Sequence, residues 1–469
     1  MVTMSCPDAD YARRVTESLW RQANMPGSAL DHLKLTGTSP LLPTSFHVAV
    51  AAQSSIACAA LAAVHLGELR GAPPQAVGVD MHDAERECTG LFTLEGRVPD
   101  AWAPLSGLYR CADGFVRIHA NFDHHRDGTL ALLGLPPRQS TREQVSQTLA
   151  RWKKVDFETE AARHGLVVAA GRTFEEWDGH SQSRFIANAP LFEIRRIGDA
   201  DPALLPALDP NSRPLSGIRA LDLTRILAGP VCGRTLAAYG ADVMLVNSPN
   251  LPNIAAIADT SRGKRSVLVD LAELKGRDKL TELLRGAHLF IQGYRPSGLE
   301  QLGFGPDAAA SIRPGIVYVS LSAYGASGPW ARRRGFDSLV QTATGFNMAE
   351  GKAAGSDLPR AMPVQILDFA SGFLMAFAAQ VALARQQAEG GSWHVQVSLA
   401  QTANWLRSLG RIENNFQARN TAPEDYLESY ACGFGELRAM PHAGQLSRTP
   451  TRWTRPSNPP GSDVPAWTD

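Results

Sequence analysis

The sequence predicts an α/β protein, with a Rossmann-like parallel-sheet domain and a smaller α+β domain. Two observations predict the larger domain: short apolar strands alternate with helices after residue 217, and a proline-rich stretch at 199–214 precedes them. Strands that alternate with helices form βαβ units on a parallel sheet. A third observation predicts the smaller domain, because two strand-like runs between 107 and 122 flank the hairpin signal Ala112-Asp113-Gly114.

The first half of the chain is predicted to be largely helical outside this hairpin. Residues 1–35 are polar and helix-like, and 46–66 are Ala-rich and apolar on most faces, as in a buried helix. Residues 77–84 begin as a short alternating strand, and 142–193 are predicted as helices with one short apolar run. We therefore place N-terminal helices at 1–84, the small α+β domain at 85–198 and a linker at 199–216.

The second half alternates regularly between strands and helices. Strands are predicted at 217–223, 241–247, 288–292 and 315–321, and helices at 228–240, 271–286 and 297–311. This pattern places the Rossmann-like domain at 217–410. The remaining segment, 411–469, is rich in proline after residue 440 and is expected to lie extended on the surface.

Two segments resemble each other and indicate an internal repeat. Residues 48–81 and 368–399 each contain an Ala-rich helix, a polar break and a strand with the pattern Val-x-Val. Ala-rich helices can also resemble each other by chance. The first segment carries no acid between Asp31 and Glu68, so nothing in it corresponds to Asp368.

Composition restricts the partners and the compartment. The chain has 469 residues, with 46 Lys and Arg against 46 Asp and Glu, so no strong field directs it to nucleic acid or an anionic membrane. Its six cysteines are scattered without a CxxC pair, which is typical of reduced thiols. The polar start lacks a signal peptide, and the longest apolar run, 54–66, is too short to span a bilayer. We expect a cytoplasmic protein.

The loop after the first predicted strand of the second half is a candidate anion site. It lacks the GxGxxG fingerprint, and Ala258 replaces the first glycine that a Walker A loop would need before Lys264, which argues against NAD and nucleoside triphosphates. The loop still joins a strand's carboxyl end to a helix N-terminus, where N–H groups favour anions. Gly229 and Gly233 would allow close approach of a ligand or, equally, tight packing of helix on strand.

Asp368 stands just before a long apolar helix and has two interpretations. The simpler one is an N-cap. The other is a nucleophile, because the positive end of the helix favours the ionised carboxylate and Gly372 leaves room for a substrate. Asp123 and the histidines His119, His124 and His125 form a further polar group; a hairpin-edge surface patch is favoured over a metal site, because no second ligand cluster has matching spacing. We predict no metal ligands.

Five motifs in order resemble class III CoA-transferases of the CaiB/BaiF type, the family of formyl-CoA transferase and alpha-methylacyl-CoA racemase. They are GIRALDLTRILAGPVCGRTLAAYGADVMLVNSP, RGKRSVLVDL, IQGYRPSGLEQLGFGP, RPGIVYVSLSAYGASGPWARRRGFDSLVQ and PVQILDFASGFLMAFAAQVAL, within about 217–403. The first 200 residues resemble the family's small domain, and GELRAMPHAGQLSRTP resembles its return segment. The order is therefore permuted, or two copies are fused and the first has lost its Rossmann-like part.

The resemblance implies a coenzyme A thioester as substrate, a small carboxylic acid as acceptor and no tightly bound cofactor. It implies that Asp368 is the nucleophile and that the protein forms an interlocked homodimer. Tyr294 and Tyr324 could offer a surface for adenine, and basic residues after the strands could hold the phosphates. The implied CoA-binding residues are Arg225, Ile226, Leu227, Ala228, Lys264, Arg265, Gly293, Tyr294, Arg295 and Tyr324.

Three activities remain open on this basis. The first is transfer of CoA between an acyl-CoA and a free carboxylic acid through an aspartyl anhydride and an aspartyl–CoA thioester. The second is an acyl-CoA racemase or isomerase, whose histidine would fall at Phe336, a residue that cannot move a proton. The third is a non-catalytic CoA-binding protein. The retained Asp368 favours transfer.

Overall fold

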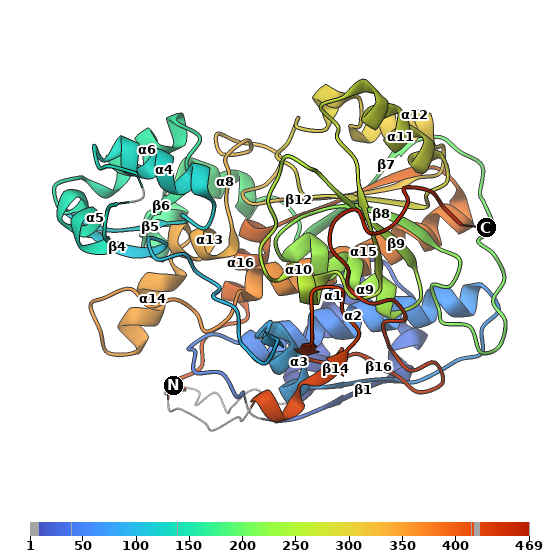
Figure 1. The fold of residues 1–469 in the computed structure, drawn as a ribbon. Helices are drawn as coiled ribbons and strands as arrows, with labels where there is room; N and C mark the ends of the chain where they lie inside the picture. The colour runs from blue at the N-terminus through green and yellow to red at the C-terminus, as the bar shows by residue number, and fades with distance from the viewer. Residues whose placement is uncertain (1–8, 39, 138, 414, 417–422, 469) are drawn as a thin grey trace.

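The computed structural model describes residues 9–38, 40–137, 139–413, 415–416 and 423–468. Figure 1 shows a main body built around a large sheet and, beside it, a smaller lobe of short helices and strands. The mixed α/β architecture with a parallel-rich sheet agrees with the predicted fold class.

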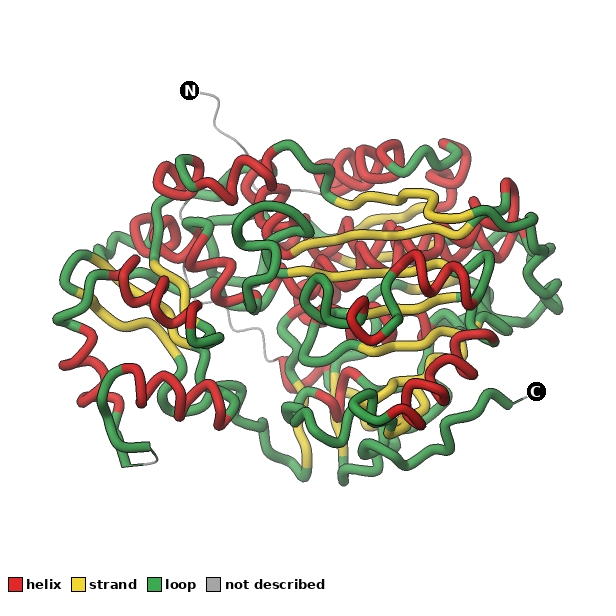
Figure 2. The backbone as a smooth tube through the Cα atoms, turned by 90° about the horizontal axis from the view of Figure 1, so that it is seen from above, coloured by secondary structure: helices red, strands yellow, loops and turns green. Residues whose placement is uncertain are grey.

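The large sheet has seven strands, in the spatial order β10-β9-β8-β11-β12-β13-β7. All neighbours are parallel except the last pair, β13 and β7, which is antiparallel. Figure 2 shows the strands side by side, with helices around them. The predicted parallel strands of the second half are therefore confirmed. The strands are β7 (Phe192–Gly198), β8 (Arg219–Leu223), β9 (Asp242–Asn247), β10 (Lys264–Leu268), β11 (Leu289–Gln292), β12 (Val317–Ser322) and β13 (Ser392–Ser398).

Two strands of this sheet were not predicted from the sequence. β7 carries charged residues at Glu193, Arg195 and Arg196 and lies at the sheet edge, where charged side chains are common and obscure the strand pattern. β10 starts with Lys264 and Arg265, whose charges indicated a phosphate-binding loop. Both strands lie at opposite edges of the sheet, the positions with the weakest apolar signal.

Helices cover both faces of the sheet and complete the βαβ units. The helices of the second half are α9 (Ala228–Ala238), α10 (Ile257–Thr260), α11 (Leu274–Arg285), α12 (Pro306–Ile312), α13 (Asp337–Ala343), α14 (Phe346–Ala353), α15 (Ile366–Glu389) and α16 (Leu399–Ser408). The proline-rich stretch 199–214, which the sequence predicted as a linker, contains neither helix nor strand.

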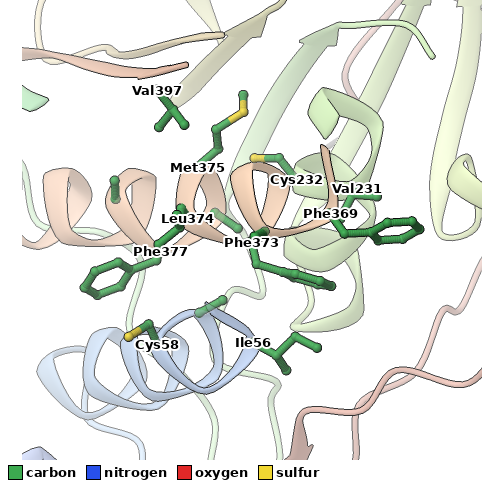
Figure 3. Packing of buried hydrophobic residues seen from close by; sticks show 14 of the residues in the cluster. Ile56, Cys58, Val231, Cys232, Phe369, Phe373, Leu374, Met375, Phe377 and Val397 are labelled. Carbon is green, nitrogen blue, oxygen red and sulfur yellow. The ribbon is translucent and has the colours of Figure 1, made fainter. Parts of the chain in front are cut away.

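A pair of long apolar helices forms the centre of the core. α2 (Val48–Leu69) packs along α15, and α15 also packs on α9. Figure 3 shows Ile56 and Cys58 of α2 facing Phe373 and Phe377 of α15, with Cys232 of α9 close by. Both α2 and α15 are long and apolar enough to cross a membrane, but 94% and 100% of their most apolar stretches lie buried inside the protein. Their composition is therefore explained by core packing.

The smaller lobe is the α+β unit that the hairpin predicted. β4 (Gly107–Cys111) and β5 (Gly114–Ile118) form the hairpin, and β6 (Val168–Ala170) adds antiparallel to β5. Helices α4 (Asp123–Leu132), α5 (Arg142–Leu149) and α6 (Lys154–Arg163) pack on this sheet around their own apolar cluster.

The first and second halves exchange strands with one another. β2 (Val77–Asp80) follows α2 and receives β16 (Gln445–Leu446) from the end of the chain as an antiparallel neighbour. β13 follows α15 and receives β7 from the first half in the same antiparallel sense. The predicted repeat thus corresponds to two helix–strand units that face each other across the core.

The remaining elements are short and complete the two halves. They are α1 (Ala9–Gln22), η1 (Gly27–His32), β1 (Leu33–Thr36), α3 (Met81–Cys88), β3 (Phe92–Leu94), α7 (Phe174–Asp178), α8 (Ser181–Ala187), η2 (Glu300–Leu302), η3 (Pro423–Tyr426), β14 (Glu428–Tyr430) and β15 (Leu437–Ala439).

Candidate active site

A cavity of about 400 Å³ opens at the carboxyl ends of β8 and β11. The chain leaves β8 towards β9 on one side, while β11 lies on the other side, so this is the topological switch point of the sheet. Open α/β sheets bind their ligands at this point. The cavity walls come from the loops after β8, β11 and β12, from the start of α15 and from the smaller lobe.

Asp368 forms part of the cavity lining in the first turn of α15. Its predicted role as an N-cap is wrong, because the N-cap residue is Gln365 and Asp368 lies two positions inside the helix. Gly372 does not make room for a substrate either: a Cβ there would lie 2.5 Å from the carbonyl oxygen of Ala228 and 2.8 Å from Val231. The glycine instead lets α15 pack tightly on α9.

Asp337 lies next to Asp368 and is fully buried at the start of α13. Its Oδ2 accepts a hydrogen bond from the backbone N–H of Asp368 at 3.0 Å, and its other oxygen accepts one from the side chain of Gln341. Asp337 therefore caps α15 from a neighbouring helix. None of the described residues donates a hydrogen bond to the carboxylate of Asp368, so that group is free towards the cavity.

The two carboxyl groups perturb each other. Burial raises the pKa of Asp368 well above its usual range, and the negative charge of Asp337 raises this pKa further. Burial also raises the pKa of Asp337, while the N–H donors around it oppose the rise. The sequence predicted that the helix N-terminus keeps Asp368 ionised. In the unliganded site the effect of burial on the pKa outweighs the effect of the helix N-terminus.

The loop from β8 to α9 brings four predicted residues to the cavity, namely Arg225, Ile226, Leu227 and Ala228. Ile226 has a φ of 78°, in the left-handed region that β-branched residues avoid at a cost of about 1–3 kcal/mol. Such strain is concentrated at functional sites. The packing around the loop therefore imposes a conformation that the local sequence would not favour.

The glycines of this loop serve packing within the protein. A Cβ on Gly229 would lie 2.4 Å from the side chain of Thr224, and one on Gly233 would lie 2.3 Å from Asp222. The sequence left two interpretations open for these glycines, close approach of a ligand or tight packing of helix on strand. For Gly233, which lies outside the cavity lining, the geometry supports tight packing. Gly229 also lines the cavity.

Gly293, Tyr294 and Arg295 line the same cavity from the loop after β11. A second cavity of about 300 Å³ lies on the other side of Tyr294 and Arg295, at the carboxyl ends of β12 and β13. The two residues therefore form a wall between adjoining hollows.

Three predicted binding residues lie outside the cavity lining. Lys264 is completely buried and its Nζ contacts Asp222 at 2.7 Å and the carbonyl oxygen of Pro230 at 2.8 Å. Arg265 contacts Asp242 at 2.9 Å, and Tyr324 is 1% exposed and packs edge-on against Trp330. The sequence shows the cations Lys264 and Arg265 but cannot show that carboxylates on other strands already neutralise them.

The smaller lobe contributes residues that the sequence did not assign to the site, namely Phe122, His124 and His125. The prediction of a surface patch is wrong for His125, which is 4% exposed and whose Nε2 accepts a hydrogen bond from Arg334 at 3.1 Å. His119 stacks on Phe336 with ring centroids 4.0 Å apart. Among the described residues no group of three or more His, Cys, Asp or Glu could hold a metal ion.

Arginines dominate the charge of the cavity. Arg225, Arg295 and Arg334 line it, and within the described ranges no acidic side chain pairs with any of them. The Nε of Arg225 is buried without a partner, and the charge of Arg295 adds to burial in lowering the pKa of Arg334. Arg333 differs, because Glu158 lies 3.5 Å away. The cavity is therefore built to receive an anion.

Residues 215–425 match the model of CoA-transferase family III. Over this segment the chain is similar to that family. The match includes every loop of the second half that lines the cavity, and it includes Asp337 and Asp368.

Relatives with this description cover part of the chain. The succinate–glutarate CoA-transferase of Agrobacterium fabrum is 32% identical over 210 residues, 40% of this chain and 52% of that protein. The acetyl-coenzyme A transferase nodX of Hypoxylon pulicicidum is 29% identical over 337 residues, 67% of this chain and 56% of that protein. A solved CAIB/BAIF family protein from Brucella suis matches 48% of this chain and 65% of that chain at 26% identity, with a TM-score of 0.38. The chain spans about half the length of the curated relatives it matches.

Proposed function

We propose that this protein transfers coenzyme A from an acyl-CoA to a free carboxylic acid, with Asp368 as the nucleophile. The carboxylate of Asp368 attacks the thioester carbonyl carbon, the carbon–sulfur bond breaks, and the CoA thiolate leaves with the electron pair. The thiolate then attacks the aspartyl carbonyl of the resulting anhydride and releases the first acid. An acceptor carboxylate attacks the aspartyl–CoA thioester, which expels the thiolate and forms a second anhydride. The thiolate then attacks the acceptor's carbonyl in this anhydride, which forms the new acyl-CoA and frees the carboxylate of Asp368.

One observation carries this proposal: a single cavity combines the carboxylate of Asp368 with arginines that have no acidic partner among the described residues. Coenzyme A carries phosphates that such arginines bind, and its thioester needs a nucleophile nearby. The names of the relatives support the same chemistry, since they describe transfer of CoA.

The smaller lobe supplies shielding from water. Phe122 and His124 line the cavity opposite the loops of the sheet, and Arg225 lies over the ring of Phe122 at 5.8 Å. An anhydride hydrolyses if water reaches it, so a cover over the cavity favours transfer over hydrolysis. The described cover comes from the same chain as Asp368.

An exchange assay with Asp368→Asn tests the proposal. The enzyme would be incubated with a panel of acyl-CoAs and labelled free acids, and label entering the thioester pool would be measured. Asp307→Asn is the matched control, because Asp307 is an exposed first-turn acid on α12 outside the cavity. The proposal requires exchange in the wild type and the control but not in Asp368→Asn; equal exchange in all three contradicts it.

Isomerisation is a second candidate, because His124 and His125 line the same cavity as Asp368 and could exchange a proton. Burial lowers the pKa of His125 to about 3, so its imidazole is neutral at pH 7 and a weak base. Exchange of the α-proton of an acyl-CoA with deuterium, without CoA transfer, would favour isomerisation.

We further propose that two copies of the family are fused in this chain and that the first has lost most of its sheet. The exchanged strands β7 and β16 support this, since each unit completes the sheet of the other. The homodimer that the resemblance implies stays a prediction, and sedimentation at micromolar concentration tests it. The cavity is lined by one chain, so the proposal expects one site per chain in either case.

A further inference from the structure

Asp337 is the buried carboxyl group that the proposed mechanism does not use. It is 0% exposed, whereas Asp368 is 8% exposed and reaches the cavity. Its carboxylate accepts the N–H of Asp368 at 3.0 Å and a hydrogen bond from Gln341. Burying a carboxyl group costs folding free energy unless hydrogen bonds or an opposite charge compensate for the lost hydration.

We propose that Asp337 is a positioning residue for Asp368: it fixes the first turn of α15 and shares one proton with Asp368, which must leave before Asp368 can attack. The inference rests on the proposed role of Asp368 as nucleophile. Two adjacent buried carboxyl groups cannot both ionise cheaply, so one proton stays with the pair.

The hydrogen bonds decide which carboxyl group carries the proton. N–H donors stabilise an anion, and they surround Asp337, while Asp368 receives none from the described residues. The anion is therefore on Asp337 and the proton on Asp368 in the unliganded site. The raised pKa of Asp368, caused by burial and then by Asp337, agrees with this assignment.

Few other charges act on the pair. Arg117 of β5 interacts electrostatically with Asp337 and is itself 6% exposed. β6 contributes only Val168 and alanines. On α16, Arg407 is bound to Asp178 at 2.7 Å, and on α14 Glu350 is bound by Thr44 and Ser45.

Chemistry then follows in two steps. The shared proton passes from Asp368 to water in the cavity, and the freed carboxylate attacks the thioester carbonyl. The carbon–sulfur bond breaks and the thiolate leaves with its electron pair, so no further proton is needed for this half of the reaction. Acidic solution should slow the reaction by keeping the proton on Asp368.

The test compares the pH dependence of kcat/KM in the wild type, Asp337→Asn and the control Asp307→Asn. The wild type and the control should lose activity on acidification at a pH above the ordinary range of a carboxyl group. Asp337→Asn keeps an acceptor oxygen but removes the charge, so its inflection should move to lower pH by about one unit or more. A merely structural Asp337 would lower the rate equally at every pH, and an unmoved inflection overturns the proposal.

Infrared difference spectra of substrate-free protein provide a readout that needs no turnover. At neutral pH the wild type should show a protonated carboxyl band that disappears in Asp368→Asn and weakens in Asp337→Asn. If Asp337→Asn does not fold, the comparison of wild type with Asp368→Asn decides alone. If the protonated carboxyl band is present but the protein transfers no CoA, the proposed function is contradicted and the shared proton is not. If the protein transfers CoA but shows no such band, the shared proton is overturned.

Discussion

α2 and α15 are two Ala-rich helices with the same structural role and different chemistry. Each is buried in the core, each leads towards a strand, and the two pack against each other. Their first turns differ: α15 presents Asp368 to a cavity beside Asp337, whereas α2 begins with Val48, Ala49 and Val50. The scaffold alone therefore does not make a site.

The surroundings of the two first turns explain the difference. α15 begins beside the loop from β8 to α9, where the sheet leaves a hollow. α2 begins among aromatic rings, with Phe46 and Phe346 at 4.6 Å and Tyr11 against His47 at 5.2 Å. Among the described residues, neither ring nitrogen of His47 has a hydrogen-bond partner. The retained sheet of the second half thus provides the space that the first half lacks.

The largest expected effect comes from making α15 resemble α2. Asp368→Val should lower kcat/KM for CoA transfer by about 10³-fold or more, since it removes the nucleophile. Its melting temperature should stay equal or rise, because a buried carboxyl group beside Asp337 is lost. Steady-state kinetics and calorimetry measure the two effects. Activity within tenfold of the wild type would break the comparison.

The reverse change makes α2 resemble α15. Val50 occupies the third helical position, as Asp368 does, and is 0% exposed. Val50→Asp should cost about 3–5 kcal/mol of unfolding free energy, because it would place a carboxyl group in the buried apolar core. Val50→Ala is the control, with a smaller loss from the cavity alone. If denaturation shows no loss of unfolding free energy for Val50→Asp, the first turn of α2 tolerates a carboxyl group as the first turn of α15 does, and the comparison fails.

Contacts between the halves should respond to acid. Glu87 of α3 contacts Arg234 of α9 at 3.1 Å and His442 at 3.0 Å. Burial alone would raise the pKa of Glu87, but His442, Arg234 and the N–H of Ala443 outweigh it and lower the pKa to about 2.

A carboxyl group with a lowered pKa stabilises the fold above its unfolded value and loses this contribution as pH falls towards the folded value. Stability from Glu87, roughly 3 kcal/mol, should therefore be present above about pH 4.5 and decline towards about pH 2. Denaturation curves across this window measure it. Glu87→Gln should flatten the curve there, and an unchanged slope would contradict the role of Glu87.

The smallest expected effect concerns the cavity cations. Arg334→Gln should raise the KM for acyl-CoA by about tenfold, or about 1.4 kcal/mol, with little change in kcat, because it removes one charge-assisted contact with an anion. Lys264→Met is not a suitable comparison, since Lys264 neutralises buried Asp222. Arg313→Gln, outside the cavity, is the control. Equal KM values for Arg334→Gln and the wild type would show that Arg334 does not contribute to binding acyl-CoA.

Local sequence patterns identified the βαβ units and the buried helices, because apolar periodicity and glycine loops are encoded within each segment. They missed β10 and β7, where charged residues hide the strand, and they placed Lys264 in the site because its partner Asp222 lies on another strand. Phe122 and His124, which cover the cavity from the smaller lobe, lie about a hundred residues before the loop after β8 in the sequence. No local pattern could therefore show that these residues line the same cavity as that loop. The resemblance singled out Asp368, but its coupling to Asp337 depends on how α13 and α15 meet.

The central claim is that Asp368 becomes covalently attached during transfer, and direct trapping tests it. The wild-type protein would be incubated with an acyl-CoA and hydroxylamine, digested, and the peptide containing Asp368 analysed by mass spectrometry, with Asp307 as the internal comparison. The account predicts a hydroxamate on Asp368 that requires acyl-CoA and is absent from Asp307. CoA transfer with an unmodified Asp368, or modification at another carboxylate, would contradict the account.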